Sequence, residues 1–203
     1  MTGDAGADGP PVRIHGYLIS TFTRTAAMVA IEKGVAYELV PVPYGSPEHA
    51  ALHPFSRIPV LEHGPTVIFE TQAIAGYLDE AFDGPSLQPS DVVGRARMRT
   101  WLGLASDYVY RDVVRGIPRG QPATADQVAA ARTALERVDG LVRSPFLVGD
   151  SLTLADLFLA PQIANVEDKL PSALEGLAEL AAWYAGIAAR ESFKRTVYEA
   201  GPA

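Results

Sequence analysis

The sequence of 203 residues predicts two domains, a small α/β domain followed by an all-α domain. Residues 12–82 alternate strand and helix patterns, first as βαβ and then as ββα. The stretch DGPSLQPS at residues 83–90 contains two prolines and a glycine and is typical of a linker. Beyond it, residues 91–203 have apolar side chains at helical spacing. Residues 1–11 are expected to be a flexible leader.

The first half of the α/β domain is predicted to be a parallel crossover. Residues 12–17 and 37–42 have the short runs typical of strands, and small apolar residues at 22–34 predict a helix between them. Gly34 supplies the C-terminal stop of that helix. Because the joints are tight, the two strands are expected to run parallel with a right-handed connection.

The second half of this domain is predicted to be a hairpin followed by a helix. After a polar stretch with a short helix at residues 47–52, strands at 59–62 and 66–69 are joined by the turn sequence His63-Gly64-Pro65. The next helix carries an apolar stripe formed by Ile74, Tyr77, Leu78, Ala81 and Phe82. This stripe is typical of a helix that packs on a sheet.

The second domain is predicted to consist of helices. The apolar periodicity places them at residues 91–116, 124–143, 153–168, 174–189 and 191–199. We find no internal repeat and no low-complexity segment in this half of the sequence.

The composition excludes several kinds of function. A net charge of −7 disfavours nucleic-acid binding, because a negative surface repels phosphate. The absence of cysteine removes disulfides, Cys-type zinc sites and any reaction of the protein's own thiol. Neither a signal peptide nor a membrane-spanning run is evident, so we expect a cytoplasmic protein with no membrane partner. Abundant alanine and 14 arginines against 3 lysines favour a GC-rich bacterial genome.

Ser20 and Thr21 stand at the junction between the first strand and the first helix. A helix N-terminus carries unpaired N–H groups and a partial positive charge, so it stabilises an anion. In one interpretation, one of these hydroxyls is simply the N-cap of the helix. In the other, a hydroxyl donates a hydrogen bond to the thiolate of a bound ligand. Ser20 and Thr23 occupy the two positions of a C-x-x-C motif, so disulfide exchange is impossible here.

Two further segments allow both a structural and a functional interpretation. General frequencies favour a trans Ile58–Pro59 bond, whereas a cis bond would turn the backbone of Ile58 outward to pair with an extended peptide. Thr71 is a good N-cap for the helix that follows Glu70. Alternatively, that helix N-terminus binds the carboxylate of an amino-acid ligand while Glu70 binds its ammonium group.

His49 and His53 have the i, i+4 spacing of two metal ligands on one helix face. Pro54 follows immediately, and the sequence offers neither a cysteine nor an evident third ligand. The pattern therefore favours two surface histidines and no metal site.

In their order and spacing, these segments resemble the cytosolic glutathione transferase family, in its serine-type phi, theta and delta-like classes, over nearly the whole chain. The segments that carry the resemblance are YLISTFTRTAAMVAIEKG at 17–34, HPFSRIPVLEHG at 53–64, FETQAIAGYL at 69–78, GDSLTLADL at 149–157 and WYAGIAARESF at 183–193. The second is similar to the pattern N-P-x-G-x-[IV]-P-x-L and the third to E-S-x-A-I-x-x-Y-L. In the fourth, Thr153 and Asp156 resemble the family's N-capping box. The resemblance implies a thioredoxin-like first domain and an all-helical second domain.

The resemblance also implies where the cysteinyl part of glutathione binds. Ser20 corresponds to the hydroxyl that stabilises the glutathione thiolate, and Tyr17 is the second candidate donor. Ile58, before a cis Pro59, corresponds to the backbone partner of the cysteinyl moiety.

The two ends of the tripeptide are assigned in the same way. Glu70 and Thr71 correspond to the γ-glutamyl site, although Thr71 replaces the usual serine. Arg57 stands where many members have glutamine, lysine or histidine. The loop at residues 43–52 has no lysine for the glycyl carboxylate, so Arg57 and His49 are the candidates for that role.

The resemblance predicts a detoxifying transferase that adds the thiolate of bound glutathione to a hydrophobic electrophile without a metal. Another low-molecular-weight thiol is the alternative co-substrate. Two other functions stay open: a non-catalytic ligand-binding or scaffold protein of the same fold, and a glutathione-dependent isomerase or dehalogenase. A homodimer is expected, and the acceptor pocket is expected between the domains, near Trp101, Ala105 and Tyr108.

Overall fold

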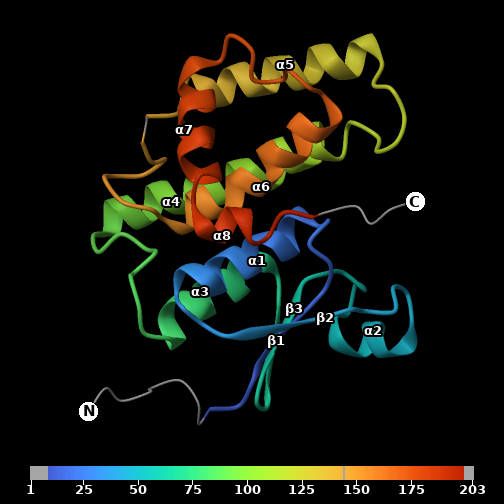
Figure 1. Ribbon diagram of the computed structural model, residues 1–203, viewed down its shortest axis with the longest axis vertical. Helices are drawn as coiled ribbons and strands as arrows, with labels where there is room; N and C mark the ends of the chain where they lie inside the picture. The colour runs from blue at the N-terminus through green and yellow to red at the C-terminus, as the bar shows by residue number, and fades with distance from the viewer. Residues whose placement is uncertain (1–8, 144, 199–203) are drawn as a thin grey trace. The chain divides into compact units, whose positions relative to one another are not determined.

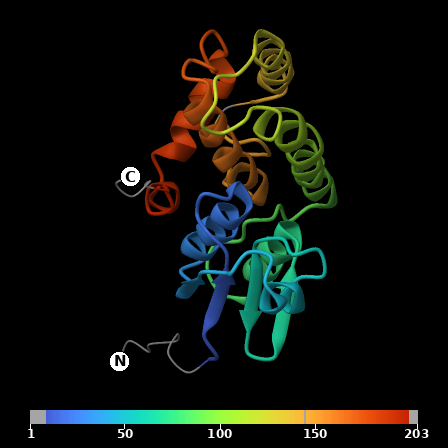
Figure 2. The same cartoon turned by 90° about the vertical axis from the view of Figure 1, so that its right-hand side faces the viewer.

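The computed structural model describes residues 9–143 and 145–198. The chain divides into two compact units, Met1–Pro85 with Arg195–Ala203 and Ser86–Lys194. We call them the first unit and the second unit, and Figure 1 and Figure 2 show the helices and strands of each. Positions 1–8 of the predicted leader and position 199 of the last predicted helix lie outside the described residues.

The first unit is built on a four-stranded mixed sheet in the order β2-β1-β3-β4. Its elements are β1 (Val12–His15), α1 (Thr21–Glu32), β2 (Tyr37–Val40), α2 (Pro47–Leu52), β3 (Val60–His63), β4 (Thr66–Phe69) and α3 (Thr71–Ala81). Strand β1 runs parallel to β2 and antiparallel to β3, and β3 runs antiparallel to β4. The predicted crossover, hairpin and thioredoxin-like fold class are therefore confirmed.

The core of the first unit lies between the sheet and the pair of helices α1 and α3. Val12, Ile14 and Leu61 are buried on β1 and β3, and α1 packs against α3. The predicted stripe on α3 is confirmed at Ile74 and Leu78, whose side chains are fully buried. Helix α2 lies on the other side of the strands (Figure 1; Figure 2). The sheet thus separates α2 from the larger apolar core.

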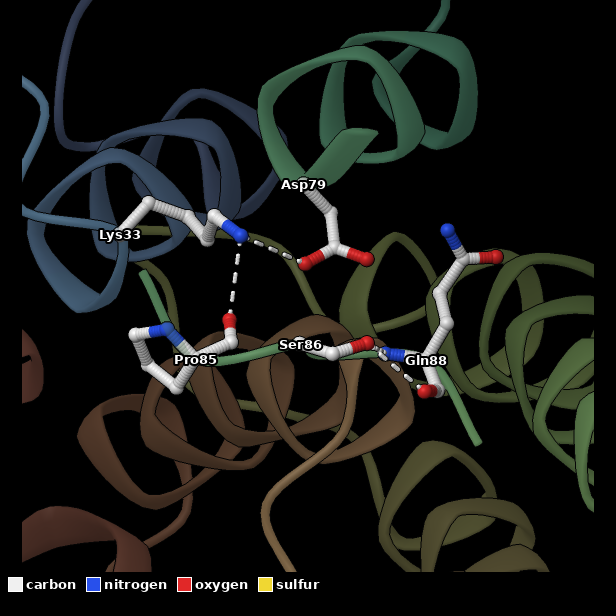
Figure 3. A network of polar contacts seen from close by, with 5 residues as sticks. All are labelled: Lys33, Asp79, Pro85, Ser86 and Gln88. Atoms are coloured by element: carbon white, nitrogen blue, oxygen red, sulfur yellow. Dashed lines mark hydrogen bonds and ion pairs between the residues drawn. The ribbon is translucent and has the colours of Figure 1, made fainter. Parts of the chain in front are cut away.

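A buried ion pair joins the end of α1 to α3 (Figure 3). Lys33 Nζ lies 3.2 Å from Asp79 Oδ1 and donates a hydrogen bond of 3.1 Å to the carbonyl oxygen of Pro85. Gly84 has a φ of +115°, and a Cβ there would lie 3.0 Å from the carbonyl oxygen of Lys33. Glycine therefore lets the chain pass close to α1, where the lysine fixes it.

The described part of the second unit is helical. Its elements are α4 (Val92–Leu104), η1 (Ala105–Val114), α5 (Ala125–Asp139), α6 (Leu154–Lys169), α7 (Ala178–Ala188) and α8 (Glu191–Lys194). Helix α6 is buried along most of its length and packs against α4, η1 and α7. It is the central helix of this unit, because every residue from Leu154 to Ile163 is buried and that stretch has no face turned to solvent.

Four predicted helices differ from those observed. The helix predicted at 124–143 ends at Asp139. The helix predicted at 91–116 is α-helical only to Leu104 and continues as the π-helix η1. The amine of Lys169 donates hydrogen bonds to the carbonyl oxygen of Val114, the last residue of η1, and to that of Ile117 just beyond it. The helix predicted at 174–189 begins at Ala178. The last helix ends at Lys194 because the chain then returns to the first unit, where Thr196 Oγ1 accepts a 3.3 Å hydrogen bond from Arg24.

The predicted capping box at the start of α6 is confirmed. Asp156 Oδ2 accepts hydrogen bonds from the backbone N–H and the hydroxyl of Thr153, at 2.9 and 3.0 Å. Its Oδ1 accepts from the backbone N–H of Leu147 at 2.9 Å and from the indole N–H of Trp183 at 2.8 Å. Burial raises the pKa of the Asp156 carboxyl, and these hydrogen bonds oppose that rise. The Asp156 carboxylate thus joins α6 to α7 and to the loop that precedes α6.

We expect Asp156→Ala to lower the free energy of unfolding by about 3–5 kcal/mol, because it leaves several buried donors without an acceptor. Urea unfolding followed by circular dichroism measures this loss. The matched control is Asp150→Ala, at an exposed position, where the change should stay within about 0.5 kcal/mol. Equal losses in the two variants would contradict the structural role of Asp156.

Candidate functional site

One rung of the sheet brings three predicted segments to the same edge. His15 at the end of β1 pairs with Val60 at the start of β3, and Val60 pairs with Phe69 at the end of β4. The segment after β1 holds Ser20, and the segments before β3 and after β4 hold the other predicted site residues. Hydrogen-bond register therefore gathers residues that are far apart in the sequence.

Ser20 is the N-cap of α1. It has an extended backbone, and its Oγ accepts a 3.3 Å hydrogen bond from the backbone N–H of Thr23. Because a serine hydroxyl is both acceptor and donor, this bond leaves the Ser20 proton available for a ligand. The cap interpretation is confirmed, and it is compatible with the functional one.

Two more hydroxyls lie in the first turn of α1. Thr21 is 6% exposed and Thr23 is fully buried, and within the described part of the chain neither hydroxyl oxygen has a hydrogen-bond partner. A Cβ on Gly16, whose φ is +152°, would lie 2.6 Å from the Thr23 hydroxyl oxygen. Glycine at this position therefore lets the loop after β1 pass directly over the start of the helix.

Tyr17 has its hydroxyl engaged with the backbone. The phenol donates a 2.6 Å hydrogen bond to the carbonyl oxygen of Val42, just beyond β2. Its proton is therefore committed to the protein, whereas the proton of Ser20 is not. This geometry favours Ser20 over Tyr17 as a donor to a ligand at the helix N-terminus.

The Ile58–Pro59 peptide bond is cis. Pro59 is buried, and Ile58 is half-buried immediately before β3. Since the ladder on β3 begins at Val60, Ile58 lies outside it. The cis geometry confirms the expectation from the family resemblance and overturns the one from general frequencies.

Glu70 occupies the N-cap position of α3, so the prediction of Thr71 as the cap is wrong. Glu70 makes no side-chain cap hydrogen bond, and its side chain is 71% exposed. Its φ of +71° lies in the left-handed region, which costs a non-glycine residue on the order of 1 kcal/mol. Thr71 is buried in the first turn of the helix. The turn thus presents a carboxylate beside the N-terminus of α3.

His49 and His53 are both buried, so the prediction of surface histidines is wrong. Nδ1 of His49 accepts a 3.3 Å hydrogen bond from the backbone N–H of Gly45, and its Nε2 lies 3.0 Å from the carbonyl oxygen of Arg57. Both ring nitrogens of His49 are thus engaged with the loop backbone. The exposed Arg57 is the better candidate for a ligand carboxylate.

His53 lies between the loop before β3 and the end of β4. Its Nδ1 accepts a 3.1 Å hydrogen bond from the backbone N–H of Phe55, which puts the proton of the neutral ring on Nε2. Nε2 lies 3.9 Å from Glu70 Oε1. Burial lowers the pKa of His53, and the Glu70 carboxylate opposes that effect. The i, i+4 spacing offered only two interpretations for His53, a metal ligand or a surface histidine, and the second was favoured. It gave no sign of this environment, because the partners of His53 come from other segments.

The three residues proposed for the acceptor pocket differ in exposure. Trp101 is 8% exposed and Ala105 is fully buried, whereas Tyr108 is 59% exposed. The guanidinium of Arg111 lies 5.8 Å from the centre of the Tyr108 ring. Of the three, Tyr108 is the one with an accessible aromatic surface.

The described residues contain no group of three or more histidine, cysteine, aspartate or glutamate side chains able to hold a metal ion. Among the same residues, no helix is both long enough and apolar enough to cross a membrane.

The low pKa of His53 makes stability depend on pH. Because the unfolded state binds a proton at higher pH than the folded state, the free energy of unfolding should fall as pH drops below about 6.5. His53→Asn removes the titrating ring, so its stability should fall less steeply over that range. Urea unfolding at several pH values measures both slopes, and identical slopes would contradict a buried, neutral His53.

A cis-proline immediately before β3, on a mixed β2-β1-β3-β4 sheet, is typical of the thioredoxin-like class of domains. Comparison with known proteins shows which family within this class the chain matches. The family model described as the N-terminal domain of glutathione S-transferase matches residues 14–86, and the model of the C-terminal domain matches residues 103–191. The chain belongs to the glutathione S-transferase family.

Relatives match over nearly their whole length. Glutathione S-transferase 3 of Zea mays is 31% identical, over 92% of this chain and 93% of its own. Glutathione S-transferase APIC of Nicotiana tabacum is 30% identical, over 90% of this chain and 95% of its own. The apo structure of glutathione S-transferase III is 28% identical with a TM-score of 0.81, covering 95% and 100% of the two chains. A glutathione S-transferase structure from Rhodospirillum rubrum F11 is 25% identical with a TM-score of 0.80, covering 93% of each.

Proposed function

We propose that this protein is a serine-type glutathione transferase, in which Ser20 stabilises the thiolate of bound glutathione for attack on an apolar electrophile. The observation that carries the proposal is the hydrogen bonding of Ser20. Its oxygen caps α1 while its proton stays available, at the sheet edge that also carries the cis Pro59 and Glu70. Family membership supports glutathione as the thiol.

The energies involved are of the required size. A free cysteine thiol has a pKa of about 8.5, so only a small fraction is thiolate at neutral pH. A hundredfold increase in its acid dissociation constant requires about 2.7 kcal/mol. A hydrogen bond to a charged group contributes about 1.5–3 kcal/mol and a helix N-terminus about 0.3–1 kcal/mol. Ser20 and α1 together reach this amount without a metal ion.

The other residues hold the rest of the tripeptide in this proposal. The backbone of Ile58, outside the ladder, pairs with the cysteinyl moiety as an added strand would. Glu70 binds the γ-glutamyl ammonium group, and the N-terminus of α3 at Thr71 binds the adjacent carboxylate. The exposed guanidinium of Arg57 binds the glycyl carboxylate.

The chemical step is a nucleophilic attack by sulfur. The thiolate donates an electron pair to an electrophilic carbon and forms a C–S bond. In a substitution the leaving group departs with its bonding pair, and in an addition the resulting carbanion takes a proton from water. Ser20 acts as a hydrogen-bond donor to sulfur before the attack and not as a base.

We expect Ser20→Ala to raise the pKa of the bound glutathione thiol towards its value in free solution, because the charge-assisted hydrogen bond is lost. The same variant should lower kcat/KM by about 10- to 100-fold. Thiolate absorbance near 240 nm, titrated against pH with glutathione bound, measures the pKa.

The matched control is Tyr17→Phe, which should leave the thiol pKa unchanged because the Tyr17 proton is committed to Val42. A pKa shift in Tyr17→Phe, without one in Ser20→Ala, would transfer the role to Tyr17. If glutathione binds the unmodified protein but its thiol keeps the pKa of free solution, the result would favour a carrier instead of an enzyme.

A homodimer is the second part of the proposal. Large apolar side chains are exposed next to the candidate site: Phe55 is 75% exposed, and Val67 and Phe69, on the edge strand β4, are 47% and 39% exposed. The centre of the His53 ring lies 4.8 Å from that of Phe69 and 6.3 Å from that of Phe55. Phe55 and Phe69 therefore flank the same histidine and belong to one region. Such a surface supports self-association.

We expect Phe55→Asp to weaken the dimer, because it places a charge in an apolar interface. Light scattering after size exclusion should show a shift towards the monomer mass at micromolar concentration. Val128→Asp, at an exposed position of α5, is the matched control and should keep the mass of the unmodified protein. An unchanged mass for Phe55→Asp would remove this region from the interface.

Bacterial origin and a cytoplasmic location stay predictions from the sequence. The curated relatives reported above come from plants, and they support glutathione over another low-molecular-weight thiol as co-substrate. A binding titration with glutathione and with one alternative thiol would separate the two.

A further inference from the structure

His53 stands where the family pattern N-P-x-G-x-[IV]-P has asparagine. An asparagine side chain in a turn accepts a hydrogen bond from the backbone N–H two residues later. Nδ1 of His53 does the same for Phe55, at 3.1 Å. The imidazole therefore preserves the turn and adds a second nitrogen on the far side of the ring.

That second nitrogen faces the carboxylate of Glu70. Nε2 of His53 lies 3.9 Å from Glu70 Oε1, and the His53 ring packs 4.8 Å from the ring of Phe69. The His53 side chain is 2% exposed, whereas that of Glu70 is 71% exposed. This separation is longer than a hydrogen bond, and the exposed Glu70 side chain has room to turn towards the buried Nε2–H and close it.

The charges around the ring make Glu70 its partner. Among the described residues, the charged or titratable groups that act on His53 are Glu70, His49 and Arg57. Of these, Glu70 is the anion, and His49 is engaged through both nitrogens with the loop backbone. The backbone of Glu70, with its φ of +71°, fixes where the side chain starts. The direction in which the carboxylate then points is left to its neighbours.

We propose that His53 is a positioning residue for Glu70, whose carboxylate it holds, through Nε2–H, towards the ammonium group of an α-amino-acid ligand. The inference rests on the proposed function, which assigns Glu70 to the γ-glutamyl ammonium group. It adds a residue that the family pattern does not supply, because asparagine is too short to offer a second donor to Glu70. One Glu70 oxygen engages His53 and the other engages the ligand.

The experiment compares two ligands with two proteins. The ligands are glutathione and its analogue glutaryl-cysteinyl-glycine. The analogue lacks the α-ammonium group of the γ-glutamyl residue but keeps the carboxylate next to it. The proteins are the unmodified chain and His53→Asn, which keeps an acceptor for the Phe55 N–H but has no Nε2–H. Isothermal titration calorimetry measures the four dissociation constants.

We expect His53→Asn to weaken glutathione binding by about three- to tenfold, less than the loss of a direct hydrogen bond to a charged group, because His53 acts on the ligand through Glu70. The dissociation constant of the analogue should not change, because the analogue has no ammonium group for Glu70 to bind. In turnover, KM for glutathione should rise while kcat stays the same, since the sulfur site is untouched. A purely structural role of His53 would weaken both ligands equally.

His63→Asn is the matched control. His63 lies at the opposite end of β3, where it pairs with Val12 and Thr66, and its replacement should leave glutathione binding unchanged. Glu70→Gln supplies a second test that does not depend on the size of the single effect. In the Glu70→Gln background, adding His53→Asn should weaken glutathione binding no further.

The inference is overturned if His53→Asn binds glutathione as well as the unmodified protein does, or if it weakens both ligands to the same extent. It is also overturned if the two substitutions have additive effects. In each case glutathione still binds the unmodified protein, so the proposed function survives. If the unmodified protein binds no glutathione, the proposed function fails and takes this inference with it.

Discussion

The candidate site depends on one hydrogen-bonded rung of the sheet, in which His15, Val60 and Phe69 lie side by side. Three segments adjoin this rung, one after β1, one before β3 and one after β4. Each of them carries a group suited to bind part of a thiol tripeptide. A slip of one residue in any strand would turn every side chain of that strand to the opposite face and displace the segment that follows or precedes it. The buried pair of Lys33 and Asp79 and the packing of α1 on α3 keep the helices in place on this sheet. Strand register is therefore the constraint from which the geometry of the site follows.

The fold was predictable wherever short-range chemistry decides the structure. Gly34 ends α1 as expected, Gly64 lies in the turn between β3 and β4, and Thr153 with Asp156 opens α6. The predictions failed where distant contacts decide. A period of 3.6 residues does not reveal that the helix changes to i→i+5 hydrogen bonds at Ala105, nor that the amine of Lys169 binds the carbonyl oxygens of Val114 and Ile117 at the other end of η1. Nor does local sequence show that the chain leaves α8 to rejoin the first unit.

The site was predictable to the extent that its residues lie in recognisable segments. Ser20, Pro59 and Glu70 were identified from motif order, and register explains why they share an edge. The burial of His49 and His53 was missed, because i, i+4 spacing says nothing about the backbone groups that fold around each ring. The conformation of Glu70 was missed for a similar reason. A left-handed non-glycine residue has no sequence signal, since the surrounding structure imposes it.

The charge of the chain bears directly on how such a site works. Glutathione carries two carboxylates against one ammonium group, and it gains a further negative charge when its thiol ionises. A protein with a net charge of −7 does not attract this ligand through its overall field. In the proposed function, binding comes instead from short-range donors, namely the N-termini of α1 and α3, the Ser20 hydroxyl and Arg57. The role that we propose for His53 fits this arrangement, because a neutral ring would direct the Glu70 carboxylate towards the single cationic group of the ligand and away from its anionic ones. Orientation of one acidic side chain then matters more than the number of basic residues nearby.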